Sequence, residues 1–164
     1  FEFKNFSKSS IQYFPEELTR LNSKYLKTFN YSEIVKISKK KISKEFWNAI
    51  RSNINSLNDL DIWSKIIYSR NFDSKINSED VKIINLAIEC LPKEIKENLW
   101  SVWTKKIANK SGIKQGKKIF LPIRKAITGL NNGPEMKLIV QLLERQEIID
   151  RLKLAIMKND NKKN

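Results

Sequence analysis

The sequence predicts an all-α protein, and three observations carry that prediction. Apolar residues recur at spacings of three and four along most of the 164 residues, which is the period of one face of an α-helix. Only four glycines and four prolines interrupt the chain, which is sparse for a β-rich fold. No segment alternates between apolar and polar residues as a half-buried strand does, and no internal repeat is visible. With 40% hydrophobic and 30% charged residues, the composition is that of a globular domain.

The first half of the chain carries three predicted helices. Pro15 suits a first helical turn, Ser43 is a candidate N-cap, and Ser56 and Asp59 have the spacing of a capping box. The apolar stripes that follow these signals are Leu18, Leu21 and Tyr25, then Phe46, Ile50 and Ile54, and then Leu60, Trp63 and Ile67.

The second half carries five more predicted helices. Asn77 or Ser78 can cap the first of them, which stops at Pro92, and Gly112 and Gly129 end the next two. Residues 112–116 form a lysine-bearing loop and residues 130–134 a turn. The apolar stripes are Ile84, Ala87, Ile88 and Leu91, then Ile95, Leu99, Trp103 and Ile107, then Phe120, Ile123 and Ile127, then Leu138 and Leu142, and last Ile148, Leu152 and Ile156.

The stretch at residues 70–80 is rich in Asn, Asp and Ser and is the best candidate for a boundary between two small helical bundles. We therefore expect a first subdomain over residues 1–76 and a second over residues 77–158. Residues 159–164 are expected to be a frayed polar tail.

The net charge of +14 is unevenly distributed along the chain. Lysine-rich composition also arises in AT-rich genomes without selection for binding, so the distribution is the informative feature. A block from Arg20 to Lys44 holds eight basic residues against Glu33, and residues 98–134 hold no acidic residue at all. Such one-signed blocks attract polyanions such as nucleic acids. The basic residues of the acid-free stretch are Lys105, Lys106, Lys110, Lys114, Lys117, Lys118, Arg124 and Lys125.

The residues that most enzymes and metal sites use are scarce. The chain has no histidine, no glycine-rich phosphate loop and no nucleophile elbow. The single Cys90 excludes a disulfide framework and a cysteine-rich zinc site, and we expect it to be a buried small hydrophobe. We therefore expect no catalytic residue and no metal site in this chain.

Targeting signals are also missing. No run of ~18 apolar residues is present, so the sequence predicts no membrane span. No charged segment followed by an apolar one resembles a secretory leader, so we do not expect secretion. The sequence begins with Phe1 rather than methionine, and we expect it to be a segment of a longer protein.

The residues around position 124 carry a family resemblance. Residues 120–129 read Phe-Leu-Pro-Ile-Arg-Lys-Ala-Ile-Thr-Gly, and Gly133-Pro134-Glu135 follow. This block closely resembles the Leu-Phe-x-Pro-Leu-Arg-x-Ala-Leu-Thr-Gly…Gly-Pro-Glu block near the C-terminus of bacterial glutamyl-tRNA synthetases. Residues 112–118 resemble that family's Gly-Val-Lys-Gly-Lys loop, with one extra residue. Residues 142–152 resemble its terminal Leu-Leu-Gly…Arg-Leu helix, with Glu144 in place of the glycine, and residues 14–25 resemble the segment just after the catalytic domain.

The resemblance implies a helical cage that grips the anticodon arm of tRNA, with the first helices as a stem-contact element. The positions that match Arg124, Gly133, Pro134 and Met136 lie at the anticodon in that family. Their chemistry suits unstacked bases. Arg124, directed away from the core toward the turn at residues 130–134, offers a planar donor fork. Pro134 fixes a turn whose backbone can approach a base, and Met136 offers an apolar face.

Each of these residues also has a structural interpretation. Arg124 can pair with a local carboxylate, Pro134 can simply start a helix, and Met136 can belong to the core. Trp100 and Trp103 lie at the start of the acid-free stretch, just before its basic residues, and we interpret both as packing residues. The residues expected to contact the tRNA backbone are Lys114, Lys117, Lys118 and Lys125.

Two departures from the family pattern are informative. Many members carry an Arg-Pro-Arg segment whose second arginine helps to read the third anticodon base, and Asn53 stands in that place here. This leaves open whether the parent enzyme charges tRNA-Glu alone or tRNA-Gln as well. Residues 36–40 mimic the Lys-Met-Ser-Lys-Ser loop of class I synthetases, but without a nucleotide-binding sheet they are better interpreted as a lysine-rich helix end.

The resemblance implies a parent enzyme that is a glutamate–tRNA ligase of class I, a cytoplasmic monomer that uses ATP and magnesium. The N-terminal catalytic part is missing, so we expect this chain to bind and discriminate tRNA without catalysing a reaction and without a cofactor of its own. A stand-alone basic helical scaffold protein with no enzymatic role is the alternative, against which the acid-free stretch argues. The lack of histidine and of phosphate loops disfavours a complete enzyme of another class.

Overall fold

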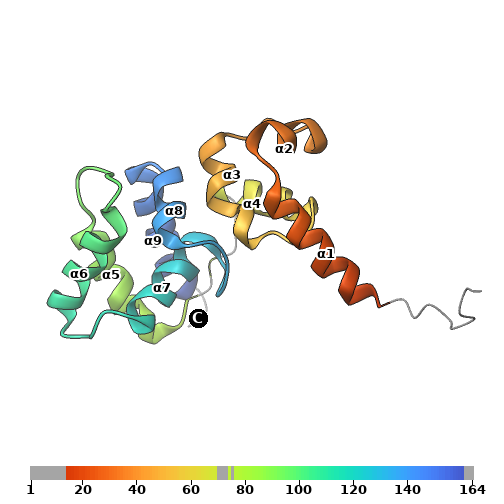
Figure 1. Cartoon of the computed structure of the whole chain (residues 1–164). Helices are drawn as coiled ribbons and strands as arrows, with labels where there is room; N and C mark the ends of the chain where they lie inside the picture. The colour runs from red at the N-terminus through yellow and green to blue at the C-terminus, as the bar shows by residue number, and fades with distance from the viewer. Residues whose placement is uncertain (1–13, 70–73, 75, 161–164) are drawn as a thin grey trace, which may run out of the picture.

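The computed structural model describes residues 14–69, 74 and 76–160, and within these it contains helices and no strand, as the sequence predicts (Figure 1). The α-helices are α1 (Pro15–Thr28), α2 (Tyr31–Ser38), α3 (Lys44–Ile50), α4 (Asn58–Tyr68), α5 (Val81–Cys90), α6 (Leu99–Ser111), α7 (Lys117–Thr128), α8 (Met136–Ile139) and α9 (Arg145–Asp160). Short 3-10 turns are η2 (Arg51–Asn53), η3 (Ser78–Asp80) and η4 (Val140–Leu142).

Local signals explain where several helices start. Ser43 caps α3 as predicted, because its side chain accepts from the backbone N–H of Phe46 at 3.0 Å. The predicted capping box of α4 is half right. The Asp59 carboxylate accepts from the N–H of Ser56 at 3.1 Å, but Leu57 is the N-cap residue and no side chain caps the helix.

Left-handed residues end three helices. Gly112 follows α6 with a φ of 69° and Gly129 follows α7 with a φ of 73°, and glycine adopts this conformation without steric cost. Lys39 ends α2 with a φ of 54°, so residues 36–40 are the lysine-rich helix end that the sequence predicts.

Three expectations need correction. α6 begins at Leu99 and leaves Ile95 outside the helix, because side chains from the C-terminal part hold the preceding loop. Gln141 donates to the carbonyl of Glu97 at 2.9 Å, and Arg145 donates to that of Pro92 at 2.9 Å. α9 continues to Asp160 with Asn159 buried, so fraying does not begin at residue 159, and residues 161–164 lie outside the described part. Cys90 is a free thiol that is only partly buried.

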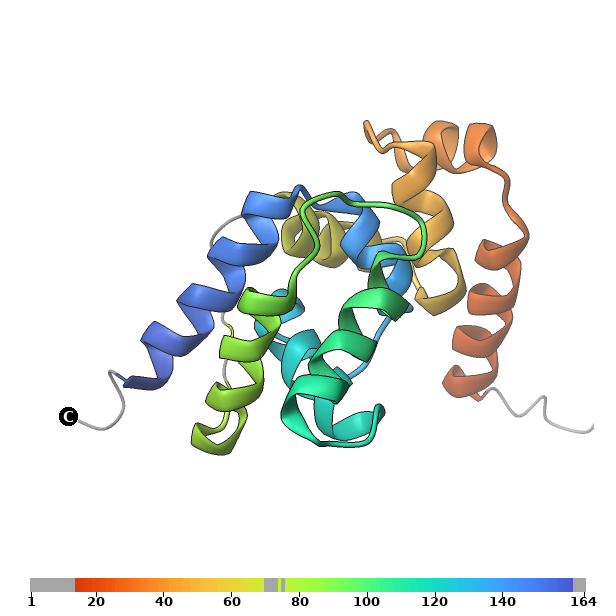
Figure 2. The same ribbon diagram turned by 90° about the vertical axis from the view of Figure 1, so that its left-hand side faces the viewer.

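The helices lie in two groups that share one core. In Figure 1, α1–α4 lie on one side and α5–α9 on the other, and α1 points away from α5–α9. In Figure 2, α1 lies at the edge of the molecule. The buried apolar residues nevertheless form one continuous cluster that runs from Leu26 to Ala155. Arg151 of α9 ties the groups together, because its guanidinium donates to the carbonyl oxygens of Ile66 and Ile67 in α4 and of Ile127 in α7. The boundary at residues 76 and 77 remains a prediction.

The α1 helix forms as predicted, but its apolar stripe is exposed. Leu18, Leu21 and Tyr25 are 49%, 56% and 65% accessible, whereas Ser23 and Leu26 are the buried side chains. The helix is attached through polar contacts, with Asn22 donating to the carbonyl of Asn55 at 2.9 Å and Ser23 to that of Ile54 at 3.2 Å. Among the described helices, none is long and apolar enough to cross a bilayer.

Candidate nucleic-acid interface

The α7 helix places its charged and apolar residues on opposite sides. Ile123 and Ile127 are fully buried against the core, whereas Lys117 and Lys118 are exposed and Arg124 and Lys125 are partly buried. Residues four apart lie on the same side of a helix. Lys117 and Lys125 therefore share one row, and Phe120 and Arg124 share the row beside it. The side of α7 that faces away from the core therefore carries Arg124 in one row and Lys125 in the next.

The turn at residues 130–134 packs tightly on α4. Gly133 has a φ of 142°, and a Cβ built on it would lie 2.5 Å from Cη2 and 2.6 Å from Cζ2 of Trp63. Only glycine allows the backbone this close to the indole ring. The close approach that the sequence suggests for Gly133 is therefore made to Trp63, in addition to any contact with a base. Pro134 is buried next to it.

Arg124 reaches this turn from α7. Its Nη2 donates to the carbonyl oxygen of Pro134 at 2.9 Å, so the side chain points away from the core in the predicted direction. Its Nη1 is buried and has no hydrogen-bond partner among the described residues, and no carboxylate pairs with it there. Burial lowers the pKa of the Arg124 guanidinium, which still carries its charge at neutral pH. A buried donor without a partner costs about 1–3 kcal/mol, which an incoming acceptor would recover.

A hollow of about 230 Å³ opens beside Arg124, and we call it the Arg124 pocket. Two aromatic rings contribute to its wall, with the Trp100 and Phe120 ring centroids 5.4 Å apart. Met136 is only 4% exposed and belongs to the core, yet it also contributes to the wall. Glu135 and Lys137 form an ion pair of 2.7 Å at the rim, which leaves Arg124 as the uncompensated charge. The lining residues are Trp100, Phe120, Arg124, Glu135, Met136 and Lys137.

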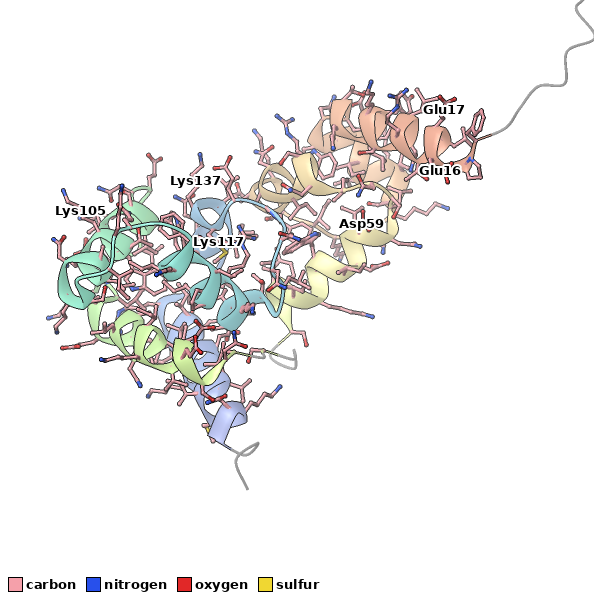
Figure 3. All side chains as sticks on the ribbon, turned by 90° about the horizontal axis from the view of Figure 1, so that it is seen from below. Glu16, Glu17, Asp59, Lys105, Lys117 and Lys137 are labelled. Atoms are coloured by element: carbon pink, nitrogen blue, oxygen red, sulfur yellow. The ribbon has the colours of Figure 1, made fainter. Side chains whose placement is uncertain are left out.

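The predicted backbone-binding lysines lie on the other side of α7. Lys117, Lys118 and Lys125 line a larger hollow of about 660 Å³ between α5 and α7, and Lys114 is exposed in the preceding loop. Among the described residues, none of these four lysines makes an ion pair. In Figure 3, Lys105, Lys117 and Lys137 all lie in the α5–α9 group, whereas Glu16 and Glu17 lie at the outer end of α1.

The stretch that lacks acids in the sequence has acids beside it in space. Glu89 of α5 pairs with Lys110, and Glu79 and Asp80 line the same hollow as the three lysines of α7. The charge run at residues 98–134 is therefore partly balanced by α5 and η3. The positive charge of residues 98–134 is less one-sided in space than the sequence suggests, although Lys105, Lys106 and Lys114 are exposed and make no ion pair among the described residues.

A comparison with known families covers most of the chain. The model of the anticodon binding domain family matches residues 17–156, which include the whole of the Arg124 pocket. The chain belongs to this family. Four of the five residues for which the sequence predicts contact with the anticodon lie on α7, on the following turn and at the start of α8.

Relatives of this anticodon-binding domain are glutamate–tRNA ligases. One from Rickettsia felis is 39% identical over 160 residues, which cover 94% of this chain and 35% of the relative. One from Bartonella tribocorum is 39% identical over 160 residues, which cover 93% of this chain and 34% of the relative. A crystal structure of a glutamate tRNA ligase from Elizabethkingia meningosepticum, in complex with its amino acid, shares the fold, with a TM-score of 0.74 and 16% identity. The match covers 96% of this chain and 35% of that one. The chain thus spans about a third of the length of these curated relatives.

The structure brings together only part of the predicted site. Arg124 and Met136 meet in the pocket, and Gly133 and Pro134 support Arg124 from the turn. Asn53 is exposed at the end of η2, where it accepts from Ser52 at 2.9 Å, and it does not line the pocket.

The sequence interpretation missed three residues of the pocket wall, namely Trp100, Phe120 and Lys137, whereas Glu135 belongs to the motif that it singled out. Of these three, Trp100 had a signal in the sequence, because it lies at the start of the acid-free stretch. A tryptophan ring can pack against its neighbours and line a pocket at the same time, and the sequence does not distinguish these two roles.

Proposed function

We propose that this chain is the anticodon-binding part of a glutamate–tRNA ligase, which attaches glutamate to its tRNA at the expense of ATP. The observation that carries the proposal is the Arg124 pocket. It combines aromatic walls, an apolar floor and a buried, unpartnered N–H donor in a chain of the anticodon-binding domain family. Stacking surfaces and edge donors are what proteins use to hold unpaired RNA bases.

The residues take different roles in this proposal. Arg124 would donate from Nη1 to an acceptor on the edge of an anticodon base, with Met136 against the face of a base. Gly133 and Pro134 would hold the turn in place and present its backbone. Lys114, Lys117, Lys118 and Lys125 would contact phosphates of the anticodon arm, and Asn53 would lie near the third anticodon base. The first helices would contact the tRNA stem.

Catalysis and its cofactors would belong to the whole ligase rather than to this chain. ATP and magnesium would bind to the part of the enzyme that this chain does not include, so the chain alone should not support exchange between ATP and pyrophosphate. The natural partner would be tRNA-Glu, and Asn53 leaves room for tRNA-Gln as a second substrate. We expect the ligase to act as a monomer in the cytoplasm.

A salt titration of tRNA binding tests the proposal. The equilibrium constant for tRNA-Glu should fall with salt, with a log–log slope of about −0.7 to −0.9 per phosphate contact. Replacing Lys114, Lys117, Lys118 and Lys125 with glutamine should flatten the slope by about three units.

The matched control removes the same charge elsewhere. Lys65, Lys82, Lys93 and Lys153 are exposed and lie outside the acid-free stretch. Their replacement with glutamine should leave the slope nearly unchanged. No measurable tRNA binding at low salt would refute the proposed function. Equal slopes in the two quadruple variants would show that charge alone, without the α7 surface, drives binding.

A further inference from the structure

Trp100 differs from the other three tryptophans of the chain in its surroundings. Trp47, Trp63 and Trp103 are 0%, 5% and 0% exposed, whereas Trp100 is only partly buried. Trp103 donates its indole N–H to the carbonyl of Ala87 at 2.8 Å and Trp47 to that of Phe29 at 3.2 Å. The indole N–H groups of Trp100 and Trp63 donate to no atom of the described residues, so Trp100 is the one that combines a free N–H with an accessible ring. A packing tryptophan usually satisfies that group.

Neighbouring rings fix the plane of Trp100. The Trp103 ring meets it edge-on, with centroids 5.9 Å apart and an interplanar angle of 83°. Phe120 of α7 lies on another side, with centroids 5.4 Å apart and an angle of 54°. Because Trp103 is itself locked by its hydrogen bond to α5, the Trp100 ring is held rigidly. Its accessible part faces the Arg124 pocket.

The charges around this ring select the class of ligand. Arg124 brings an uncompensated cation into the pocket, and the lysines Lys117, Lys118 and Lys125 line the neighbouring hollow on the other side of α7. A flat aromatic surface beside cations that can follow a phosphate backbone is the arrangement that binds single-stranded nucleic acid. A purely apolar ligand would leave Arg124 unpaired, and a free phosphate would not use the ring.

We propose that Trp100 is the platform on which one unpaired RNA base stacks while Arg124 donates to the edge of that base. The inference rests on the proposed function and deepens it, because it assigns a role to a residue outside the predicted anticodon set. Stacking is tolerant of base identity, since every base has a π-face. Trp100 should therefore contribute affinity for any unpaired loop, whereas Arg124 contributes the choice of base.

Tryptophan fluorescence of the full chain gives a direct readout, because Trp100 is the tryptophan that RNA can reach. Titration with an anticodon stem–loop RNA should quench the emission, and a fully paired duplex with the same stem should quench it far less. Trp100→Phe keeps a ring and should bind within about threefold of the parent chain, but the quenching should disappear. Quenching that persists in Trp100→Phe, or that is equal with the duplex, would overturn the assignment.

Affinity gives the second readout. Trp100→Ala should weaken binding of the stem–loop roughly 5- to 150-fold, which is the range for alanine replacement of a stacking aromatic residue. The loss should be similar for a glutamate anticodon and for an altered anticodon. Tyr68→Ala is the matched control, because Tyr68 is 58% exposed and does not line the pocket. It should bind as the parent chain does.

Different results would refute the proposed function and the stacking role of Trp100. No RNA binding by the parent chain would refute the proposed function itself. Tight binding with an unchanged affinity in Trp100→Ala would overturn the stacking role alone. If Trp100→Ala melts at a much lower temperature, the comparison of the parent chain with Trp100→Phe still decides the matter.

Discussion

Arg151 and Arg124 are both partly removed from water, and burial lowers the pKa of both guanidinium groups. Arg151 lies where α4, α7 and α9 meet and is only 2% exposed. It donates to three backbone carbonyls at 2.7–2.9 Å and to the carboxylate of Glu147 at 2.8 Å. Arg124 donates to one carbonyl, that of Pro134, and leaves its buried Nη1 without a partner in the described part of the chain.

The difference separates a structural arginine from a candidate binding one. The carbonyls that Arg151 satisfies belong to the last turns of α4 and α7, where helices carry unpaired carbonyl oxygens and partial negative charge. Its desolvation is thus compensated within the fold. Arg124 carries a desolvation cost that the fold does not fully compensate, and it does so beside a pocket. A buried donor without a partner calls for an explanation, and the explanation that we propose for Arg124 is a ligand in the adjacent pocket.

The largest effect expected from this comparison is the loss of protein stability when Arg151 is replaced. Arg151→Met should lower the free energy of unfolding by about 3–5 kcal/mol, because it leaves Glu147 and three buried carbonyls without their partner. Chemical denaturation followed by circular dichroism measures this change. Arg124→Met is the matched control, and it should cost no more than about 1.5 kcal/mol, since a single hydrogen bond is lost. Equal losses would remove the distinction between the two arginines.

The second effect concerns the turn that supports Arg124. Gly133→Ala places a Cβ against Trp63, and we expect it to cost about 1–3 kcal/mol more than Gly116→Ala. Gly116 has a similar φ of 155° but nothing within 4 Å of its Cβ position, so it controls for backbone strain. Because the shifted turn moves the carbonyl of Pro134, RNA affinity should fall as well. Thermal melts of the two variants check the loss of stability, and RNA titrations check the loss of affinity. Indistinguishable variants would show that the Trp63 ring moves aside at little cost.

The sequence predicted the parts of this molecule that depend on neighbours along the chain. Ser43 caps α3 and Gly129 ends α7 because the deciding atoms lie within a few residues of each other. The direction of Arg124 followed from its place beside Ile123 on one helix. The burial of an apolar stripe does not follow from periodicity alone, and the exposed Leu18, Leu21 and Tyr25 of α1 show this.

The features that the sequence could not predict depend on contacts between distant segments. Ile95 lies outside α6 because Gln141 and Arg145 hold the preceding loop. The close contact between Gly133 and the Trp63 ring joins residues that are 70 positions apart. The position of Trp100 in the pocket depends on Phe120 and Met136, from two other helices. The acid-free stretch likewise meets its acids only in space, at Glu89 and η3.

The last of these effects, on the choice of base, is the most direct test of the central claim that Arg124 reads a base. The measurement is the ratio of dissociation constants for two anticodon stem–loops, one with a glutamate anticodon and one with altered anticodon bases. It is made for the parent chain and for Arg124→Ala. A base contact through the guanidinium is worth about 1–3 kcal/mol of discrimination, if the energetics of direct readout in DNA carry over. The preference for the glutamate anticodon should therefore fall roughly 5- to 150-fold in the variant, with little change in melting temperature. Equal weakening toward both RNAs, accompanied by a lower melting temperature, would show that Arg124 is structural and would contradict the account.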